Sequence, residues 1–309
     1  MSTLIYTHPT CALHEMGYGH PERPDRLKAV LAALDAPDLK GLPRREAPEA
    51  TIEQIARVHP VPYIEEILRA VPSRGYQALG MDTVMNPHTA AAALRAAGAV
   101  CAAVDDVMAG RAPTAFCAVR PPGHHAEPET AMGFCFFNNV AIGAAQARAV
   151  HGVKRVAVID FDVHHGNGTQ AMFEADPNLF FASTHQWPLY PGTGRPSERG
   201  VGNIVNCPLP PAAGSEEFRE AFRERILPAL VEFSPDLIMV SAGFDAHRSD
   251  PLANLELEDE DYAWATRELL RVADHACAGR IVSTLEGGYD LAALAASAAA
   301  HVRSLARLQ

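Results

Sequence analysis

Short apolar runs alternate with longer helical patterns along the sequence, and this alternation constrains the fold more than any other feature. The apolar runs predict strands at Leu4–Tyr6, Thr114–Val119, Val156–Asp162, Leu179–Ser183, Leu237–Ser241 and Arg280–Glu286. The helical patterns lie at 22–34, 51–70, 89–109, 138–151, 167–175, 215–233, 258–278 and 290–307. Because a repeated strand–helix–strand order builds a parallel sheet covered on both faces, we expect an α/β fold.

Polar clusters begin at the points where five of these strands end. They are Arg120–His125, Asp160–Asn167, Thr184–His185, Ala242–Asp245 and Glu286–Tyr289. In open α/β sheets, binding sites form at the carboxyl ends of the strands. If the sheet is parallel, five distant segments therefore deliver polar side chains to one edge.

The length and charge of the chain limit the classes of protein it can be. Its 309 residues, 48% of them apolar, can bury one large core, and no linker-like stretch divides them, so we expect a single domain over residues 1–309. The net charge is −11, whereas nucleic-acid binding needs a basic face, so no nucleic-acid partner is expected. A negative field suits a cationic partner such as a lysine-rich peptide or a polyamine, although it first favours solubility.

The sequence also indicates a cytoplasmic protein that does not cross a membrane. No strongly apolar run reaches the roughly 18 residues of a membrane span, and the first residues lack a signal-peptide pattern. The six cysteines form no Cys-x-x-Cys pair, so we expect reduced, mostly buried thiols. The sequence leaves an oligomer open.

Two separate segments carry residues that suit a metal ion. On a strand through Val156–His164, alternation would place Asp160, Asp162 and His164 on one face, where two carboxylates and an imidazole need a cation among them. Asp245 follows another buried strand and Gly243, and we expect it to supply a third ligand. An Asp-x-His pattern alone is more often a set of hydrogen-bonded polar residues, but two converging segments favour a catalytic zinc site with open positions.

Two adjacent histidines form a second element. His124 and His125 follow Pro-Pro-Gly, so both side chains can enter one pocket. Each needs a partner that fixes its tautomer, and Asp160 and Asn167 are the available candidates. A carboxylate behind one imidazole and an amide behind the other would give the two rings different pKa values, which can divide acid and base roles.

The segment Glu286-Gly-Gly-Tyr289 is the third element. Two glycines after a strand allow a close approach of the backbone and place the tyrosine at the same edge. A phenol opposite a metal would stabilise an oxyanion. Alone, the Gly-Gly-Tyr pattern indicates only a turn.

Taken together, these motifs resemble the zinc-dependent histone deacetylases. The resemblance rests on Arg120–Ala126, Gly133–Asn139, Asp160–Gly168, Tyr190–Gly194, Ser241–Asp245 and Glu286–Tyr289, in the family's order over almost the whole chain. His20–Arg26, Asn167 and Asp250–Leu252 look like the class II branch and its bacterial amidohydrolase relatives. The resemblance implies an arginase/deacetylase-like fold with an eight-stranded, mostly parallel sheet, two strands more than the sequence pattern predicts.

The resemblance also implies roles for individual residues. Asp162, His164 and Asp245 would bind one catalytic zinc ion. His125, backed by Asn167, would be the main general base and acid, with His124 and Asp160 as its electrostatic partners, and Tyr289 would bind the substrate carbonyl. Gly133, Phe134, Tyr190 and Leu252 would line the substrate tunnel. Asp82 would either clamp the substrate at the rim or cap a helix.

The resemblance further implies structural potassium. A first ion would lie near Asp160, Asp162, His164, Ser183 and Thr184. A second potassium site would be formed by backbone oxygens around Phe173, Asp176 and Leu179. The expected activity is hydrolysis of an acetylated lysine peptide or a similar small acylated amine, with release of acetate.

Three alternatives stay open at this stage. An acetylpolyamine amidohydrolase is the nearest one, but Leu252 stands where such enzymes carry an acidic gatekeeper. A binuclear manganese ureohydrolase is the second. Its second metal ion would need carboxylate ligands at the positions of His165 and His247, because manganese prefers oxygen ligands. A protein that binds acetylated ligands without catalysis is the third.

Overall fold

The structure, a computed structural model that describes residues 3–308, contains an eight-stranded parallel sheet. Its strands, in spatial order, are β2 (Arg44–Glu46), β1 (Leu4–Thr7), β5 (Thr114–Cys117), β10 (Ile281–Leu285), β9 (Leu237–Ala242), β6 (Val156–Asp160), β7 (Leu179–Gln186) and β8 (Ile204–Leu209). Every neighbouring pair is parallel. The expected α/β fold and the eight strands implied by the resemblance are therefore confirmed.

The two strands that the sequence pattern missed are the edge strands. β2 reads Arg-Arg-Glu and is exposed, and β8 carries Asn206 and Pro208. An edge strand pairs on one side only and tolerates charge and proline there. Because charged residues make up β2, and a polar residue and a proline interrupt β8, neither segment contains the apolar run from which the other strands were predicted.

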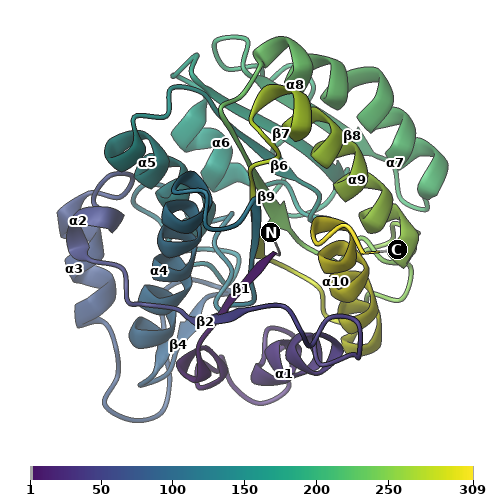
Figure 1. Cartoon of the computed structure of the whole chain (residues 1–309). Coiled ribbons are helices and arrows are strands. Elements are labelled where there is room, and N and C mark those ends of the chain that lie inside the picture. The colour runs from purple at the N-terminus through teal and green to yellow at the C-terminus, as the bar shows by residue number, and fades with distance from the viewer. Residues whose placement is uncertain (1–2, 309) are drawn as a thin grey trace.

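Helices cover both faces of the sheet (Figure 1). They are α1 (Pro24–Ala33), α2 (Ile52–Ile55), α3 (Val61–Arg69), α4 (Thr89–Met108), α5 (Asn139–His151), α6 (Asn167–Phe173), α7 (Ser215–Ala221), α8 (Leu227–Phe233), α9 (Asp259–Ala276) and α10 (Leu291–Leu305). In Figure 1, α4 and α5 lie on one side of the sheet, and α9 and α10 pack together on the other. The chain thus forms three layers around a core of buried aliphatic and aromatic side chains.

Two predicted helices differ in detail from the observed ones. The pattern at 51–70 forms two helices, because Pro60 ends the first stretch and caps α3. The pattern at 215–233 forms α7 and α8 joined by a π-helical turn at Phe222–Ile226. A small antiparallel pair, β3 (Gln77–Ala78) and β4 (Val84–Met85), was not predicted.

The structure also bears on the expectations about membrane-spanning helices and about the cysteines. Among residues 3–308, no helix combines the length and the apolar character that a membrane crossing requires. All six cysteines are buried and free, as expected.

Candidate active site

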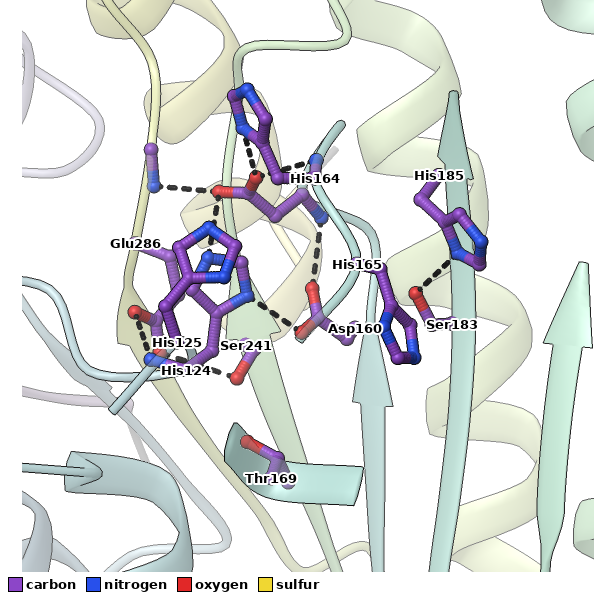
Figure 2. Close-up of polar contacts among 12 residues, drawn as sticks. His124, His125, Asp160, His164, His165, Thr169, Ser183, His185, Ser241 and Glu286 are labelled. Atoms are coloured by element: carbon purple, nitrogen blue, oxygen red, sulfur yellow. Dashed lines mark hydrogen bonds and ion pairs between the residues drawn. The ribbon is translucent and has the colours of Figure 1, made fainter. Parts of the chain in front are cut away.

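Loops that follow strands of the sheet bring the candidate residues together at its carboxyl-terminal edge. The residues, with the strand that each follows, are His124 and His125 after β5, Asp162 and His164 after β6, Asp245 after β9, and Tyr289 after β10. Figure 2 shows both histidines of the first loop beside Asp160 and beneath His164. The predicted meeting of distant segments at one edge is therefore observed.

Asp162, His164 and Asp245 form the one group among the described residues in which three potential metal ligands meet. One donor atom from each lies within 4.8 Å of the other two. His164 Nδ1 is 3.1 Å from an oxygen of Asp162 and 3.2 Å from an oxygen of Asp245. Both carboxylates are buried, so water cannot compensate their charge.

The pKa shifts in this group reflect that uncompensated charge. Burial alone would raise the pKa of Asp162, but the imidazoles of His124 and His164 hold it well below its usual range. Burial and the charge of Asp162 raise the pKa of Asp245. Burial opposes charge on His164, but its hydrogen bonds with Asp162 and Asp245 raise its pKa to about 10. The group thus attracts positive charge strongly.

Backbone groups hold the two carboxylates in place. The N–H of Gly287 donates to Asp162 Oδ2 at 2.8 Å, and the N–H of Val163 donates to Asp245 Oδ1 at 2.8 Å. A Cβ atom on Gly243 would collide with the Asp162 carboxylate, and one on Gly287 with that of Asp245. One imidazole and two oriented carboxylates that leave further positions open are a donor set of catalytic zinc sites, so these residues fit such an ion.

Strand alternation does not align these ligands in the way predicted. β6 ends at Asp160, so Asp162 and His164 lie on the loop beyond it. The N–H of Asp162 donates to Asp160 Oδ1 at 3.0 Å, and the N–H of His164 donates to Asp162 Oδ1 at 2.9 Å. Aspartate side chains often close turns by accepting from the N–H two residues later, and two such turns here replace the expected shared face.

The adjacent histidines have the partners that the sequence indicated. His124 Nδ1 is 2.9 Å from Asp160 Oδ2, and His125 Nδ1 is 2.8 Å from Asn167 Oδ1. The Asn167 amide nitrogen donates to Glu127 at 2.8 Å, which leaves its oxygen to accept from His125. With Nδ1 of His125 protonated, its Nε2 is free to accept a proton.

The surroundings separate the pKa values of the two imidazoles. Burial disfavours charge on both rings. In His124 the carboxylates of Asp160 and Asp162 overcome this effect and hold the pKa well above its ordinary value. In His125 the neighbouring His124 and His164 add to the effect, and the pKa falls well below its ordinary value. A charged and a neutral imidazole thus lie side by side, with ring centres 4.0 Å apart.

A cavity of about 210 Å³ leads to this centre. The side chains that line it include both adjacent histidines, His164 and Tyr289, and also Gly133, Phe134, Tyr190 and Leu252, the four predicted tunnel residues. Asp82 lines it as well, and accepts a hydrogen bond from the Gly133 N–H at 3.2 Å. The helix-capping role considered for Asp82 is not found, because the nearest helix, α4, begins at Thr89 with His88 as its cap.

A larger hollow of about 430 Å³ lies elsewhere, between α5 and α6. Of its three charged lining residues, Arg148 and Asp176 pair with each other at 2.6 Å and Arg57 contacts Gln146, and the lining has no imidazole. The smaller cavity is the better candidate for a reaction site, because polar groups with displaced pKa values converge there.

Three residues that the sequence motifs contain, but to which sequence reasoning gave no role, position the centre. The Glu286 carboxylate accepts hydrogen bonds from the N–H groups of Gly123 and His124, at 2.7 and 3.1 Å. Asp250 accepts from the Tyr289 N–H at 2.7 Å. Arg26 donates to the Gly288 carbonyl at 2.6 Å. A glutamate directly after a buried strand was a signal for the first; the others depend on long-range contacts.

The residues implied for a first potassium ion lie on the neighbouring strands β6 and β7 and on the loop that follows β6. Ser183 and Thr184 are buried on β7, and Ser183 pairs in register with Asp160 of β6. The Ser183 hydroxyl lies 2.9 Å from His185 Nδ1. Potassium at this place stays a prediction.

Comparisons with known proteins identify the family. Residues 20–305 match the model of the histone deacetylase domain. The chain is 42% identical to histone deacetylase 14, chloroplastic, of Arabidopsis thaliana, over 98% of this chain and 76% of the relative. It is 41% identical to the histone deacetylase-like amidohydrolase of Pseudomonas aeruginosa, over 88% and 73%.

A solved structure agrees with these sequence matches. The crystal structure of the HDA15 HD domain superposes with a TM-score of 0.94 at 36% identity, covering 99% of this chain and 89% of that one. The fold is therefore the arginase/deacetylase fold, and the matched relatives are deacetylases and amidohydrolases. The chain belongs to the histone deacetylase family and is a hydrolase that acts on amide bonds.

Proposed function

We propose that this protein is a zinc-dependent deacetylase that hydrolyses the amide of an acetylated lysine, or of a similar acylated amine, and releases acetate. The observation that carries the proposal is the meeting of Asp162, His164 and Asp245 within 4.8 Å beside the adjacent imidazoles of His124 and His125. The match over residues 20–305 supports a single catalytic domain over the chain.

The zinc ion would be held by Asp162, His164 and Asp245. When bound, zinc acidifies a water molecule and polarises the carbonyl of the amide. The donor set supports this choice, because two carboxylates and one imidazole leave positions free for water and substrate. Buried and held by backbone N–H groups, the carboxylates need little rearrangement to bind the ion.

His125 would move the protons of the reaction. Its Nε2 accepts the proton of the attacking water while Asn167 holds the proton on Nδ1, which fixes the tautomer. The resulting imidazolium then protonates the leaving amine. The Asp160 carboxylate, 2.9 Å from Nδ1 of His124, favours a charged imidazole there, which would stabilise the negative charge that develops on the substrate.

Tyr289 would stabilise the developing oxyanion of the substrate. Its ring lines the cavity, and the Arg26 guanidinium lies 4.8 Å from the ring centre. The backbone N–H of Tyr289 donates to Asp250, which fixes the loop. A phenol donor held beside the reacting carbonyl would stabilise the negative charge that develops on its oxygen.

The lining of the cavity supports an acyl-lysine substrate. Phe134, Tyr190 and Leu252 supply apolar walls, which suit the methylene stem of a lysine. An acetylpolyamine carries a further cation that benefits from an acid near the rim, and Leu252 supplies none. Asp82 at the rim keeps the polyamine alternative open.

The positions of His165 and His247 do not support a binuclear manganese ureohydrolase, in which residues at these positions would bind a second metal ion. Both ring nitrogens of His165 are engaged, with Thr193 at 2.8 Å and Gln170 at 2.9 Å. The His247 ring points toward Asp259, at 3.7 Å. Neither histidine belongs to the ligand group. The amidohydrolase family match likewise leaves no support for a non-catalytic protein.

The remaining expectations concern the first potassium ion, the partners and the compartment. The proximity of Asp160 and Ser183 on paired strands supports an ion there. The net charge of −11 supports a cationic peptide rather than a nucleic acid as partner. The six free cysteines support a reducing compartment such as the cytoplasm, whereas two relatives carry the word chloroplastic in their names.

The test compares three substrates: an acetyl-lysine peptide, a trifluoroacetyl-lysine peptide and acetylputrescine. We expect the zinc-loaded protein to cleave both peptides faster than acetylputrescine, to lose activity with a chelator and to regain it with zinc. Faster cleavage of acetylputrescine would favour the polyamine alternative. A zinc-loaded protein that cleaves none of the three would contradict the proposal.

A further inference from the structure

Three main-chain carbonyl groups converge on the side-chain amide of Asn203. Its nitrogen lies 2.8 Å from the oxygen of Phe173, 3.0 Å from that of Asp176 and 2.6 Å from that of Leu179. These are the backbone oxygens that the family resemblance assigns to a second potassium ion. The nitrogen is thus within hydrogen-bond distance of all three oxygens.

The orientation of the amide is fixed by its other end. The Val201 N–H donates to Asn203 Oδ1 at 3.2 Å, so the oxygen faces Val201 and the nitrogen faces the carbonyls. Gly200 has a positive φ of 54°, and a Cβ there would lie 2.6 Å from Asn203 Oδ1. Asn203 itself is 5% exposed. The side-chain amide of Asn203 is therefore buried, and its orientation is fixed by the Val201 N–H and by the close approach of Gly200.

Two N–H hydrogens can serve three carbonyls here because two of these oxygens have another donor. The oxygen of Phe173 also accepts from the Asp176 N–H, and the oxygen of Asp176 from the Leu179 N–H, both at 3.0 Å. Each carbonyl oxygen has two lone pairs, so these bonds coexist with the amide contacts. While the amide is in place, the distances leave no room for a cation among the oxygens. The site does not fit a second potassium ion.

We propose that the Asn203 side chain replaces the second potassium ion in this chain. The amide joins the last turn of α6, the start of β7 and the residue before β8. Carbonyls at the end of a helix lack partners within the helix, and either a cation or an N–H donor can satisfy them. An amide does so permanently, so the anchoring of α6 does not depend on the potassium concentration.

The test measures ion occupancy and stability rather than activity. Crystals soaked with thallium(I), a potassium substitute with a strong anomalous signal, should show no ion among the three carbonyls of the unaltered protein. Asn203→Ala should lower the unfolding midpoint by roughly 5 °C in tetramethylammonium chloride, because buried carbonyls lose their donor. Asn254→Ala, at an exposed asparagine, is the matched control and should leave the midpoint unchanged.

A second variant covers the case in which Asn203→Ala does not fold. Asn203→Asp keeps the size but replaces the donor by a carboxylate oxygen, which the carbonyls repel unless a cation intervenes. Its midpoint should therefore rise more than that of the unaltered protein when potassium chloride replaces tetramethylammonium chloride at equal ionic strength. A thallium ion at this place in the unaltered protein would overturn the proposal. So would an unchanged midpoint in Asn203→Ala, or an equal response to potassium in Asn203→Asp.

Discussion

Two clusters of buried charge share the loop Glu286–Tyr289, and they differ in how their charge is compensated. In the first, Glu22 contacts Arg120 at 2.6 Å and Arg26 at 3.0 Å, all three side chains being fully buried. In the second, Asp162 and Asp245 have only imidazoles and backbone N–H groups around them. In the first cluster the carboxylate already has cationic partners from the protein, so the cluster is complete without a ligand, whereas the two carboxylates of the second need a cation.

The difference separates a structural cluster from a reactive one. Burial would raise the pKa of Glu22, but Arg120 holds it well below its usual range, so Glu22 is ionised and paired. In contrast, burial and the charge of Asp162 raise the pKa of Asp245. Burying a charge without a partner costs folding free energy, and a chain that keeps such a cluster gains a place for a metal.

The largest effect is expected from removing a ligand of the incomplete cluster. Asp245→Ala should abolish metal binding, because it leaves one carboxylate and one imidazole. Zinc content after dialysis, measured by atomic absorption, checks this. Retention of one zinc per chain would show that Asp245 is not a zinc ligand. The statement that the second cluster needs a cation to compensate its charge would then be wrong.

Breaking the complete cluster should affect folding and not the metal. Glu22→Gln removes the carboxylate that pairs with the buried Arg120 and Arg26, which should cost about 3–5 kcal/mol of unfolding free energy. Asp25→Asn, at a half-exposed neighbour, should cause no measurable change. Chemical denaturation of the zinc-loaded proteins measures both. If Glu22→Gln lost zinc at unchanged stability, Glu22 would belong to the reactive cluster.

The same variant should change the pH dependence of stability. Because the folded-state pKa of Glu22 lies below its ordinary value of 4.5, its contribution is fully present above that value and is lost as pH falls through the folded pKa. Glu22→Gln should therefore flatten the loss of stability on acidification. Parallel curves for the two proteins would contradict this assignment.

Removing the phenol should separate metal binding from turnover. Tyr289→Phe should keep zinc and lower kcat by about 100- to 1000-fold, since a preorganised donor to an oxyanion typically contributes that much. Steady-state kinetics on the acetyl-lysine peptide, together with zinc content, checks it. A variant with near-normal kcat would remove Tyr289 from the mechanism.

The smallest effect concerns the amide behind His125. Asn167→Asp places a carboxylate at that position and should raise the pKa of His125. His125 must be neutral to act as a base, so the acid limb of the kcat/KM profile should move up by roughly one pH unit. An unmoved acid limb would show that another group controls it.

The sequence predicted the candidate site well, because the site is built at the ends of strands that have clear apolar patterns. The strand that ends at Asp160 followed from such a pattern, whereas the pairing of His125 with Asn167 followed from the family resemblance. The edge strand at Ile204–Leu209 did not, because Pro208 and Asn206 break its pattern. The predicted helix over 51–70 also failed, since Pro60 divides it.

By itself, the sequence determined the α/β class, the sheet edge that carries the site, and the residue types that gather there. The tertiary structure decided that Glu286, Asp250 and Arg26 hydrogen-bond to the loops that carry the site residues. It also decided that the side-chain amide of Asn203 contacts the three carbonyl groups near the end of α6. Local patterns depend on periodicities of two and 3.6 residues, which can be read along a chain. Contacts such as Arg26 with Gly288 join residues 262 positions apart, so only the folded chain brings them together.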